Sequence, residues 1–265
     1  MKDKVFIESE DSDYSSSCHL LLELNEKSYN FAVVKTDSGS LQCLASIDQP
    51  FKSGSNEIPA INFSKISIST FTKSFVFIPE SEFSEGLEAS FMSFLQVSPE
   101  KEELFSNFMQ KEKPVRNIYA LDRALISDLS SSFENARIFT QVNSLYEGAL
   151  NVSGSGLFVN FKDRHIEVLL LKEQSLQFYN AFEFQNEEEI LYFLLLTAQQ
   201  KGFSPKATRL YVSGQISLES TTYKQLALHF PNLAFSTKNE INISQEFGGA
   251  PLHQFFTLFN LYTCA

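Results

Sequence analysis

Few residues of this sequence have the types and the spacing that chemistry on a small molecule or a metal ion requires. The chain has four histidines, His19, His165, His229 and His253. None of them has another His or a Cys three or four residues away, which is a common arrangement of metal ligands. Asp11 and Asp13 lie in an acidic N-terminal stretch, where no rigid frame would hold an ion. The sequence therefore predicts no metal site.

Covalent catalysis and the common nucleotide motifs find no support either. Gly154-Ser155-Gly156 lacks the G-x-S-x-G spacing of a nucleophile elbow, and neither GxxxxGK[ST] nor GxGxxG occurs. The three cysteines, Cys18, Cys43 and Cys264, have no paired spacing, which indicates reduced thiols. Cys18 and Cys43 are expected on adjacent strands as small apolar core residues.

The elements that would position a site are organised around a stretch that occurs twice. Gly156 to Phe184 has the alternating pattern of three β-strands joined by short polar turns, and His19 to Ile47 has the same pattern. The two align without a gap from His19/Gly156 to Ser38/Ser175. The first copy then carries two extra residues, Gly39 and Ser40. The repeat predicts two copies of one α/β unit.

The segments after each repeat predict strands and helices in a similar order. In the first half we expect a loop over 48–65, a strand over 71–78, helices over 81–95 and 99–110, a strand over 115–120, a helix over 122–133, a strand over 136–140 and a helix from 144. In the second half we expect a helix from the Asn186 cap to Lys201, buried on most sides and ended by Gly202, then a strand over 208–212, a helix over 218–229, a strand over 233–235 and a helix over 251–262. This organisation predicts domains at 1–153, with an acidic tail and a helical insertion at about 79–113, and at 154–265.

Three antiparallel strands followed by helices and further strands is the order of the ribonuclease-H-like fold. Two such units in tandem resemble the actin-like ATPase superfamily, which includes actin, sugar kinases and the bacterial division and pilus-assembly actins. The chain is also similar to an uncharacterised bacterial family, filed as a domain of unknown function, that has this fold. The resemblance covers most of the chain and implies an α/β protein of two lobes, with mixed sheets, helices on both faces and a nucleotide cleft.

In that superfamily each first hairpin holds a phosphate loop of the form Asp-x-Gly-Thr/Ser, in which the Gly lets the backbone approach the phosphates. The resemblance maps the first loop onto Glu23-Leu24-Asn25-Glu26. Asn25 tolerates a left-handed turn. Glu26 would set a carboxylate where a phosphate should lie, which costs on the order of several kcal/mol in a poorly hydrated site.

The second loop maps onto Asn160-Phe161-Lys162-Asp163, where Asn160 replaces the metal-organising Asp and Lys162 replaces the Gly. A Lys attracts phosphate, so anion binding at this turn stays open. The adenosine-binding Gly-Gly turn of the superfamily has a partial counterpart in which Gly214 is the single glycine. All three nucleotide motifs are therefore eroded.

The expected helices of 81–110 carry five phenylalanines, Phe83, Phe91, Phe94, Phe105 and Phe108. Insertions in the first half of bacterial actin-like proteins often carry protein contacts, so the resemblance makes these residues candidates for a partner-binding face. The alternative is that they pack on the first sheet. We favour this alternative by about two to one, because apolar side chains more often pack inside a protein than form an exposed patch.

Charge and hydropathy restrict the surroundings in which the chain works. A net charge of −11 and the lack of a basic cluster disfavour nucleic-acid binding. The longest strongly apolar run, Ile190 to Leu196, is far shorter than the ~20 residues of a membrane span. The N-terminus has no apolar signal region, so we expect a cytoplasmic protein.

These observations favour a non-catalytic actin-like scaffold or adaptor with an unknown protein partner and no cofactor. The alternative from another class is a divergent nucleotide-dependent enzyme, in which Glu23 positions Mg²⁺ and Lys162 holds the phosphates of ATP. A third possibility is an obligate subunit whose 81–110 segment binds its partner.

Overall fold

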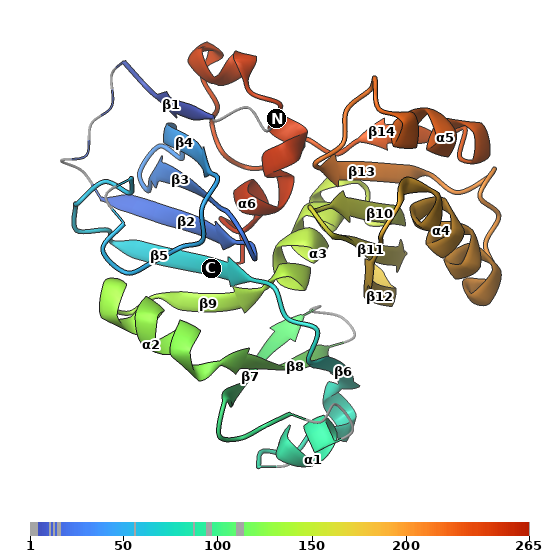
Figure 1. The fold of residues 1–265 in the computed structure, drawn as a ribbon, viewed down its shortest axis with the longest axis horizontal. Coiled ribbons are helices and arrows are strands. Elements are labelled where there is room, and N and C mark those ends of the chain that lie inside the picture. The colour runs from blue at the N-terminus through green and yellow to red at the C-terminus, as the bar shows by residue number, and fades with distance from the viewer. Residues whose placement is uncertain are drawn as a thin grey trace. The chain divides into compact units, whose positions relative to one another are not determined.

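The computed structural model describes residues 5–10, 12, 14, 17–55, 57–86, 88–93, 97–109 and 114–264 (Figure 1). The chain forms two compact units. Unit 1 comprises Met1–Asn143, Ile241–Phe247 and Leu261–Ala265, and unit 2 comprises Ser144–Glu240 and Gly248–Asn260. The segment 241–247 belongs to unit 1 because Asn242 forms a parallel bridge with Ser40. Such a long-range return is invisible in the sequence.

The main sheet of unit 1 contains the first repeat. Its strands are β1 (Phe6–Glu8), β2 (Cys18–Leu24), β3 (Tyr29–Lys35), β4 (Leu41–Ile47), β5 (Lys65–Thr70) and β9 (Arg137–Thr140), in the order β1-β4-β3-β2-β5-β9. The meander β2-β3-β4 is antiparallel, whereas β2, β5 and β9 run parallel. Cys18 and Cys43 are both buried, but β3 lies between their strands, so the expectation of adjacent strands is wrong.

Strand β5 was not expected, because the predicted loop ended at residue 65 and the next predicted strand began at residue 71, and its place in the sheet changes the comparison of the two halves. Its sequence alternates Ile66 and Ile68 with Ser67 and Ser69, and all four side chains are buried. Because β5 pairs in parallel with β2, it is the first-half counterpart of the strand expected over 208–212. The expected strand over 115–120 exists, but it lies in a separate sheet.

That separate sheet is an insertion between β5 and the helix α2 (Arg123–Ser132). It consists of β6 (Phe75–Pro79), β8 (Val115–Asp122) and β7 (Glu102–Met109), in the order β6-β8-β7. In place of the single helix expected over 81–95, the described part shows the short turn η1 (Glu80–Glu82) and the helix α1 (Glu88–Met92). The helix expected over 99–110 is wrong, because 102–109 pairs along its whole length with β8. Pairing with β8 makes this segment a strand, although its apolar residues have helical spacing.

Unit 2 contains the second repeat. Its sheet has the order β12-β11-β10-β13-β14, built from β10 (Gly156–Phe161), β11 (His165–Lys172), β12 (Ser175–Glu183), β13 (Leu210–Gly214) and β14 (Leu233–Phe235). Unit 2 also contains most of α3 (Gln141–Val152), the helix expected at the end of the first half, together with α4 (Glu187–Lys201), α5 (Thr221–His229), the turn η4 (Leu252–Phe255) and α6 (Phe256–Asn260). A further turn, η3 (Gln245–Gly249), precedes η4.

Helix α4 begins and ends where the sequence predicts. The Asn186 side chain accepts a hydrogen bond from the Glu189 N–H, and Gly202 ends the helix with a φ of 68°. The expectation that α4 is buried on most sides is wrong, because Tyr192 is 61% exposed. Ile190 and Leu194 are fully buried and supply its contact with the core.

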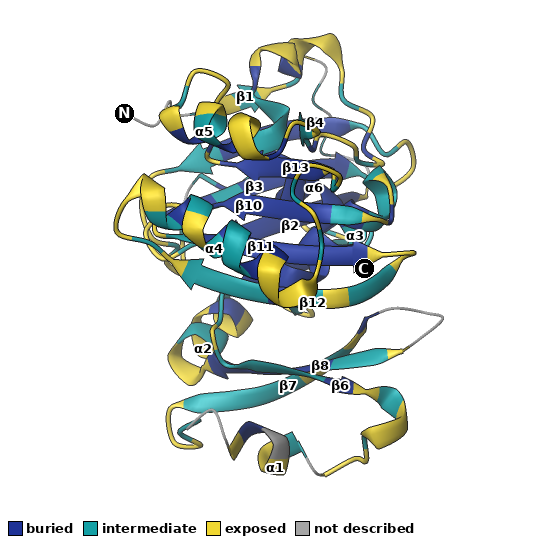
Figure 2. Cartoon of the chain, turned by 90° about the vertical axis from the view of Figure 1, so that its right-hand side faces the viewer, coloured by how far each residue is buried: buried dark blue, intermediate teal, exposed yellow. Residues whose placement is uncertain are grey.

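The two meanders present the same face to their cores. Leu20, Leu22 and Leu24 of β2 lie in the core of unit 1. Leu157, Val159 and Phe161, their counterparts in the repeat, lie in the core of unit 2. In Figure 2 the strands β2 and β10 are largely buried, whereas the β6-β8-β7 sheet is mostly half-buried. No helix among the described residues is long and apolar enough to cross a membrane.

Candidate functional site

The first hairpin holds three of the residues mapped onto a phosphate loop. Glu23 lies near the end of β2, is 3% exposed, and its Oε2 accepts a hydrogen bond of 3.0 Å from the Asn30 side chain. The turn closes when the Asn25 N–H donates to the Ser28 carbonyl at 2.9 Å, and Glu26 lies exposed at its tip. Asn25 does not have a positive φ, so this turn forms without the left-handed conformation that a phosphate loop takes from its glycine.

The second hairpin has the same turn and a more extensive polar network. Asn160 is fully buried in β10, and its Nδ2 donates to Glu167 Oε2 at 2.6 Å. Its Oδ1 accepts from Ser213 Oγ at 3.1 Å, and Tyr179 Oη donates to Glu167 Oε1 at 3.4 Å. The Lys162 N–H closes the turn on the His165 carbonyl at 3.0 Å, while the Lys162 side chain is half-buried.

The two hairpins carry the same pair of groups with the strands exchanged. In unit 1 the carboxyl group of Glu23 is on the first strand and the amide of Asn30 on the second, whereas in unit 2 the amide of Asn160 is on the first strand and the carboxyl of Glu167 on the second. Each pair is seven residues apart and directly opposed in its ladder. A buried carboxyl group needs such donors, because an unpaired one would lose its hydration without compensation. The polar atoms of Glu23 and Asn160 are therefore bonded to their own sheets.

The parallel neighbour strand adds a serine to each pair, with different results. Ser213 of β13 lies beside Asn160 and donates to it. Ser69 of β5 lies beside Glu23 in the corresponding register, is 1% exposed, and among the described residues its hydroxyl has no hydrogen-bond partner. A buried hydroxyl without a partner is destabilising.

Gly214 is needed for the packing of unit 2 itself. Its φ is +79°, and a Cβ at this position would clash with the carbonyl oxygen of Phe161 and lie 2.6 Å from Asn160 Oδ1. The next residue, Gln215, donates its N–H to the same Phe161 carbonyl at 2.8 Å. Close approach of two strands therefore explains this glycine without a nucleotide.

Of the residues proposed from the sequence, the structure brings Asn160 and Gly214 into contact in unit 2 and places Glu23, Asn25 and Glu26 on one hairpin of unit 1. Sequence reasoning missed the partners of these residues, which are Asn30, Ser69, Glu167, Tyr179 and Ser213. A signal for two of them existed, because Asn30 and Glu167 follow Glu23 and Asn160 at the same interval. Within the described residues no three His, Cys, Asp or Glu side chains gather as a metal site would require.

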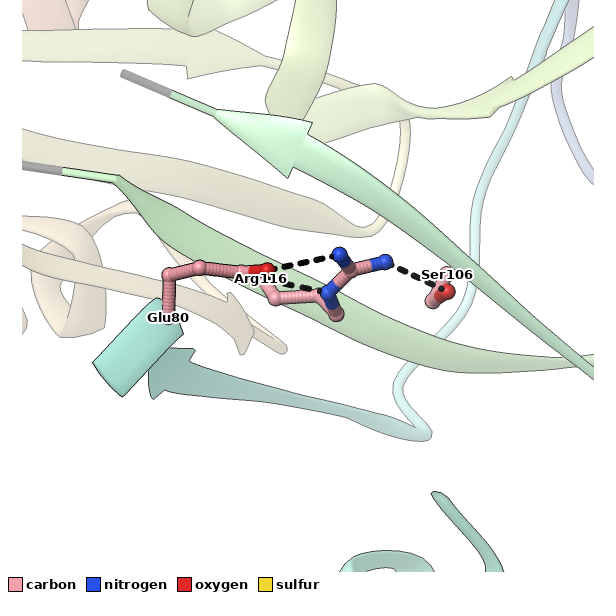
Figure 3. A network of polar contacts seen from close by, with 3 residues as sticks. All are labelled: Glu80, Ser106 and Arg116. Atoms are coloured by element: carbon pink, nitrogen blue, oxygen red, sulfur yellow. Dashed lines mark hydrogen bonds and ion pairs between the residues drawn. The ribbon is translucent and has the colours of Figure 1, made fainter. Parts of the chain in front are cut away.

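A second candidate surface lies on the inserted sheet, where the Arg116 side chain is hydrogen-bonded to Glu80 and Ser106 (Figure 3). Two aromatic rings flank its guanidinium. The Arg116 guanidinium lies 4.0 Å from the ring centre of Phe83 and 3.9 Å from that of Phe108. It makes two hydrogen bonds to the carboxylate of Glu80, at 2.9 and 3.0 Å, and a third to Ser106 Oγ at 3.3 Å. We call Glu80, Phe83, Phe108 and Arg116 the Arg116 cluster.

The electrostatics of this cluster are those of a fixed charge pair. Hydrogen bonding to Arg116 lowers the pKa of Glu80, and hydrogen bonding to Glu80 raises the pKa of Arg116. Phe108 is 58% exposed, so its ring is accessible beside the guanidinium. A rigid guanidinium flanked by aromatic rings is a typical composition for the centre of a protein interface.

The five candidate phenylalanines do not share one face. Phe83 and Phe108 lie on the face of the Arg116 cluster, whereas Phe105 stacks on Tyr119 on the opposite face of the sheet. From that opposite face Tyr119 Oη donates to the carbonyl of Ile138 in β9, the edge strand of the main sheet of unit 1. The side chain of Phe91 and all of Phe94 lie outside the described residues.

Comparison with protein families gives the place of the chain among known proteins. A family model described as "Protein of unknown function (DUF3822)" matches residues 8–233. The chain belongs to the DUF3822 family. This confirms the resemblance to a bacterial family of unknown function that the sequence suggested. No protein with a curated description matches the sequence.

Solved structures confirm the fold of this DUF3822 chain. A protein of Bacteroides thetaiotaomicron with actin-like ATPase fold and unknown function is 18% identical, with a TM-score of 0.75 over 96% of this chain and 99% of that one. The PilM-PilN type IV pilus biogenesis complex gives 14% identity and a TM-score of 0.60 over 92% and 97%. The cytoplasmic domain of EpsL, an inner membrane component of the type II secretion system of Vibrio cholerae, gives 10% and 0.50 over 94% and 96%. The chain therefore has the actin-like fold.

Proposed function

We propose that this protein is a non-catalytic, cytoplasmic actin-like scaffold that binds a protein partner through the Arg116 cluster. The observation that carries the first part is the burial of the polar groups at both phosphate-loop positions. Glu23 and Asn160 are at most 3% exposed and are bonded to Asn30 and Glu167 of their own sheets. Their hydrogen-bonding capacity serves folding, whereas a nucleotide site needs such groups turned toward the ligand.

Calorimetric titration with ATP and Mg²⁺ tests this part. We expect no binding heat at millimolar nucleotide and no phosphate release. The alternative enzyme, in which Glu23 positions Mg²⁺ and Lys162 holds phosphate, predicts binding that Lys162→Ala abolishes, and Lys224→Ala in the exposed part of α5 is the matched control. Micromolar affinity with turnover would refute the scaffold.

Support for a protein partner comes from the inserted sheet and from similar structures. The Arg116 cluster exposes Phe108 beside a guanidinium whose orientation Glu80 fixes. One structure with the same fold is a complex of two proteins, PilM and PilN, and another is a component of a secretion system. By analogy alone, an assembly role for this chain is consistent with its fold.

Affinity purification from the native cell tests the partner surface, with the full chain as bait. Phe108→Ser should remove the partner that wild-type protein retains, because it deletes the exposed ring at the centre of the cluster. Leu228→Ser, at an 81% exposed position of α5, is the matched control and should retain it. Equal recovery with both variants would refute this surface as the binding site.

A further inference from the structure

The described part of unit 1 shows no counterpart of one helix of unit 2. In unit 2 the chain between β12 and β13 forms α4, which buries Ile190 and Leu194 in the core. In unit 1 the corresponding chain between β4 and β5, residues 48–64, contains no helix in its described part. It places Ile58 in the core but leaves Phe51 and Phe63 only half-buried.

A pocket of about 700 Å³ lies where the helix is missing. It is lined on one side by residues 51, 53–55 and 58–63, and on the other by residues 131–135 at and just after the end of α2. A hydrogen bond of 3.0 Å from Ser132 Oγ to Ser53 Oγ joins the two sides. In unit 2, by contrast, α4 and α5 are in direct contact.

One pair of equivalent phenylalanines, Phe133 in unit 1 and Phe230 in unit 2, differs in burial at the pocket. Phe133 follows α2 at the position that Phe230 occupies after α5. Phe230 is fully buried in the core of unit 2, whereas Phe133 is half-buried and lines the pocket. The ring of Phe133 stacks on that of Phe51, with 5.7 Å between the ring centres. The described residues of unit 1 therefore leave an opening beside its core in which apolar side chains, among them Phe51 and Phe133, alternate with polar ones.

We propose that an amphipathic helix of a protein partner, apolar on one face and rich in Lys and Arg on the other, fills this pocket. A helix is about 11 Å across and rises about 5.4 Å per turn, so 700 Å³ corresponds to the inward half of about three turns. Helix-in-groove binding of this kind is a common mode of recognition.

The charge of the rim determines the polar face of this partner. Glu134 is the charged residue among those described as lining the pocket. The last turn of α2 carries no basic side chain, so its negative dipole end adds to the field of Glu134. A net charge of −11 on the whole chain acts in the same direction. This surface is separate from the Arg116 cluster, and the inference does not depend on that cluster binding anything.

The test uses a fluorescein-labelled model helix with leucine on one face and lysine on the other, titrated onto the full chain and followed by anisotropy. Wild-type protein should bind it at micromolar concentration. Ala60→Trp, which fills the pocket from an exposed loop position, should weaken binding about tenfold. Ala227→Trp, at an exposed position of α5, is the matched control and should bind like wild type.

A second pocket variant and a reversed probe complete the design. Ser131→Trp fills the pocket from the α2 side and should act like Ala60→Trp. A helix with glutamate in place of lysine should bind more weakly, and Glu134→Lys should reduce that preference. Equal binding by wild type and both pocket variants would overturn the proposal. So would a dimer of this chain that Ala60→Trp dissociates, because the occupant would then be a second copy.

Discussion

The exchanged carboxyl and amide groups of the two hairpins allow a stringent test of the fold's polar core. Replacing Asn160 with Glu sets a second carboxyl group against Glu167 in a fully buried position. Replacing Glu167 with Asn leaves two amides and one acceptor oxygen where the carboxylate offered two, to Asn160 and to Tyr179. The double variant Asn160→Glu/Glu167→Asn recreates in unit 2 the arrangement that unit 1 has with Glu23 and Asn30.

The expected energies follow from the geometry. Two carboxylates about 4 Å apart repel by about 4 kcal/mol at an effective dielectric constant of about 20. Uptake of one proton limits this penalty, because protonating a glutamate of ordinary pKa at pH 7 costs about 3.7 kcal/mol. Asn160→Glu should therefore destabilise by about 4 kcal/mol, and Glu167→Asn by about 1 to 3 kcal/mol through the weakened hydrogen bonds to Asn160 and Tyr179. The double variant should recover at least about 2 kcal/mol of the summed loss.

Urea unfolding followed by far-UV circular dichroism measures the four free energies of the cycle, and amide hydrogen exchange in β10 and β13 reports unit 2 locally. The two units can unfold separately, so the exchange data decide which transition belongs to unit 2. Additive losses in the double variant would refute the reasoning. A stable Asn160→Glu variant would also refute it, because the carboxyl pair would then not be buried as described.

Three further predictions concern single residues. Ser213→Ala should lower the free energy of unfolding by about 1 to 2 kcal/mol because it removes a buried donor, whereas Ser69→Ala should leave it unchanged or raise it, since the Ser69 hydroxyl has no described partner. Equal losses in urea melts would contradict this. Burial lowers the pKa of His19 from 6.5 to about 3, with a smaller effect of a nearby lysine, so the unfolded chain binds more protons between these values. Stability should therefore be complete above pH 6.5 and fall by up to about 1.4 kcal/mol per pH unit below it, a slope that His19→Gln should flatten in thermal melts at several pH values. Gly214→Ala should lower the free energy of unfolding by about 3 kcal/mol or more, because the new Cβ would clash with backbone atoms. Gly202→Ala, with a similar φ but open space around it, should lower it by about 1 kcal/mol. Similar thermal shifts for both variants would show that strand packing does not require Gly214.

Local patterns were sufficient wherever a segment's own chemistry determines its conformation. The period-two alternation from His19 to Ile47 and from Gly156 to Phe184 predicted both meanders, and the structure contains them in matching register. The Asn186 cap and the Gly202 stop defined α4. Capping and alternation involve neighbours in the chain, so a sequence displays them directly.

Long-range pairing could not be predicted in the same way. Strand β5 looks polar because Ser67 and Ser69 alternate with its isoleucines, and only its position between β2 and β9 buries both faces. Segment 102–109 has apolar residues at helical spacing, yet pairing with β8 makes it a strand.

The sequence by itself determined that the chain repeats one α/β unit and that its phosphate-loop positions carry the wrong residues, because both facts are properties of local pattern and residue type. Only the tertiary structure decided how those residues are used. The bonds of Glu23 to Asn30 and of Asn160 to Glu167 form across a strand ladder, and the opening beside Phe133 exists because a segment distant in the chain did not form a helix. Hydrogen bonds and packing between distant segments depend on which strands become neighbours, and that choice is made by the whole fold.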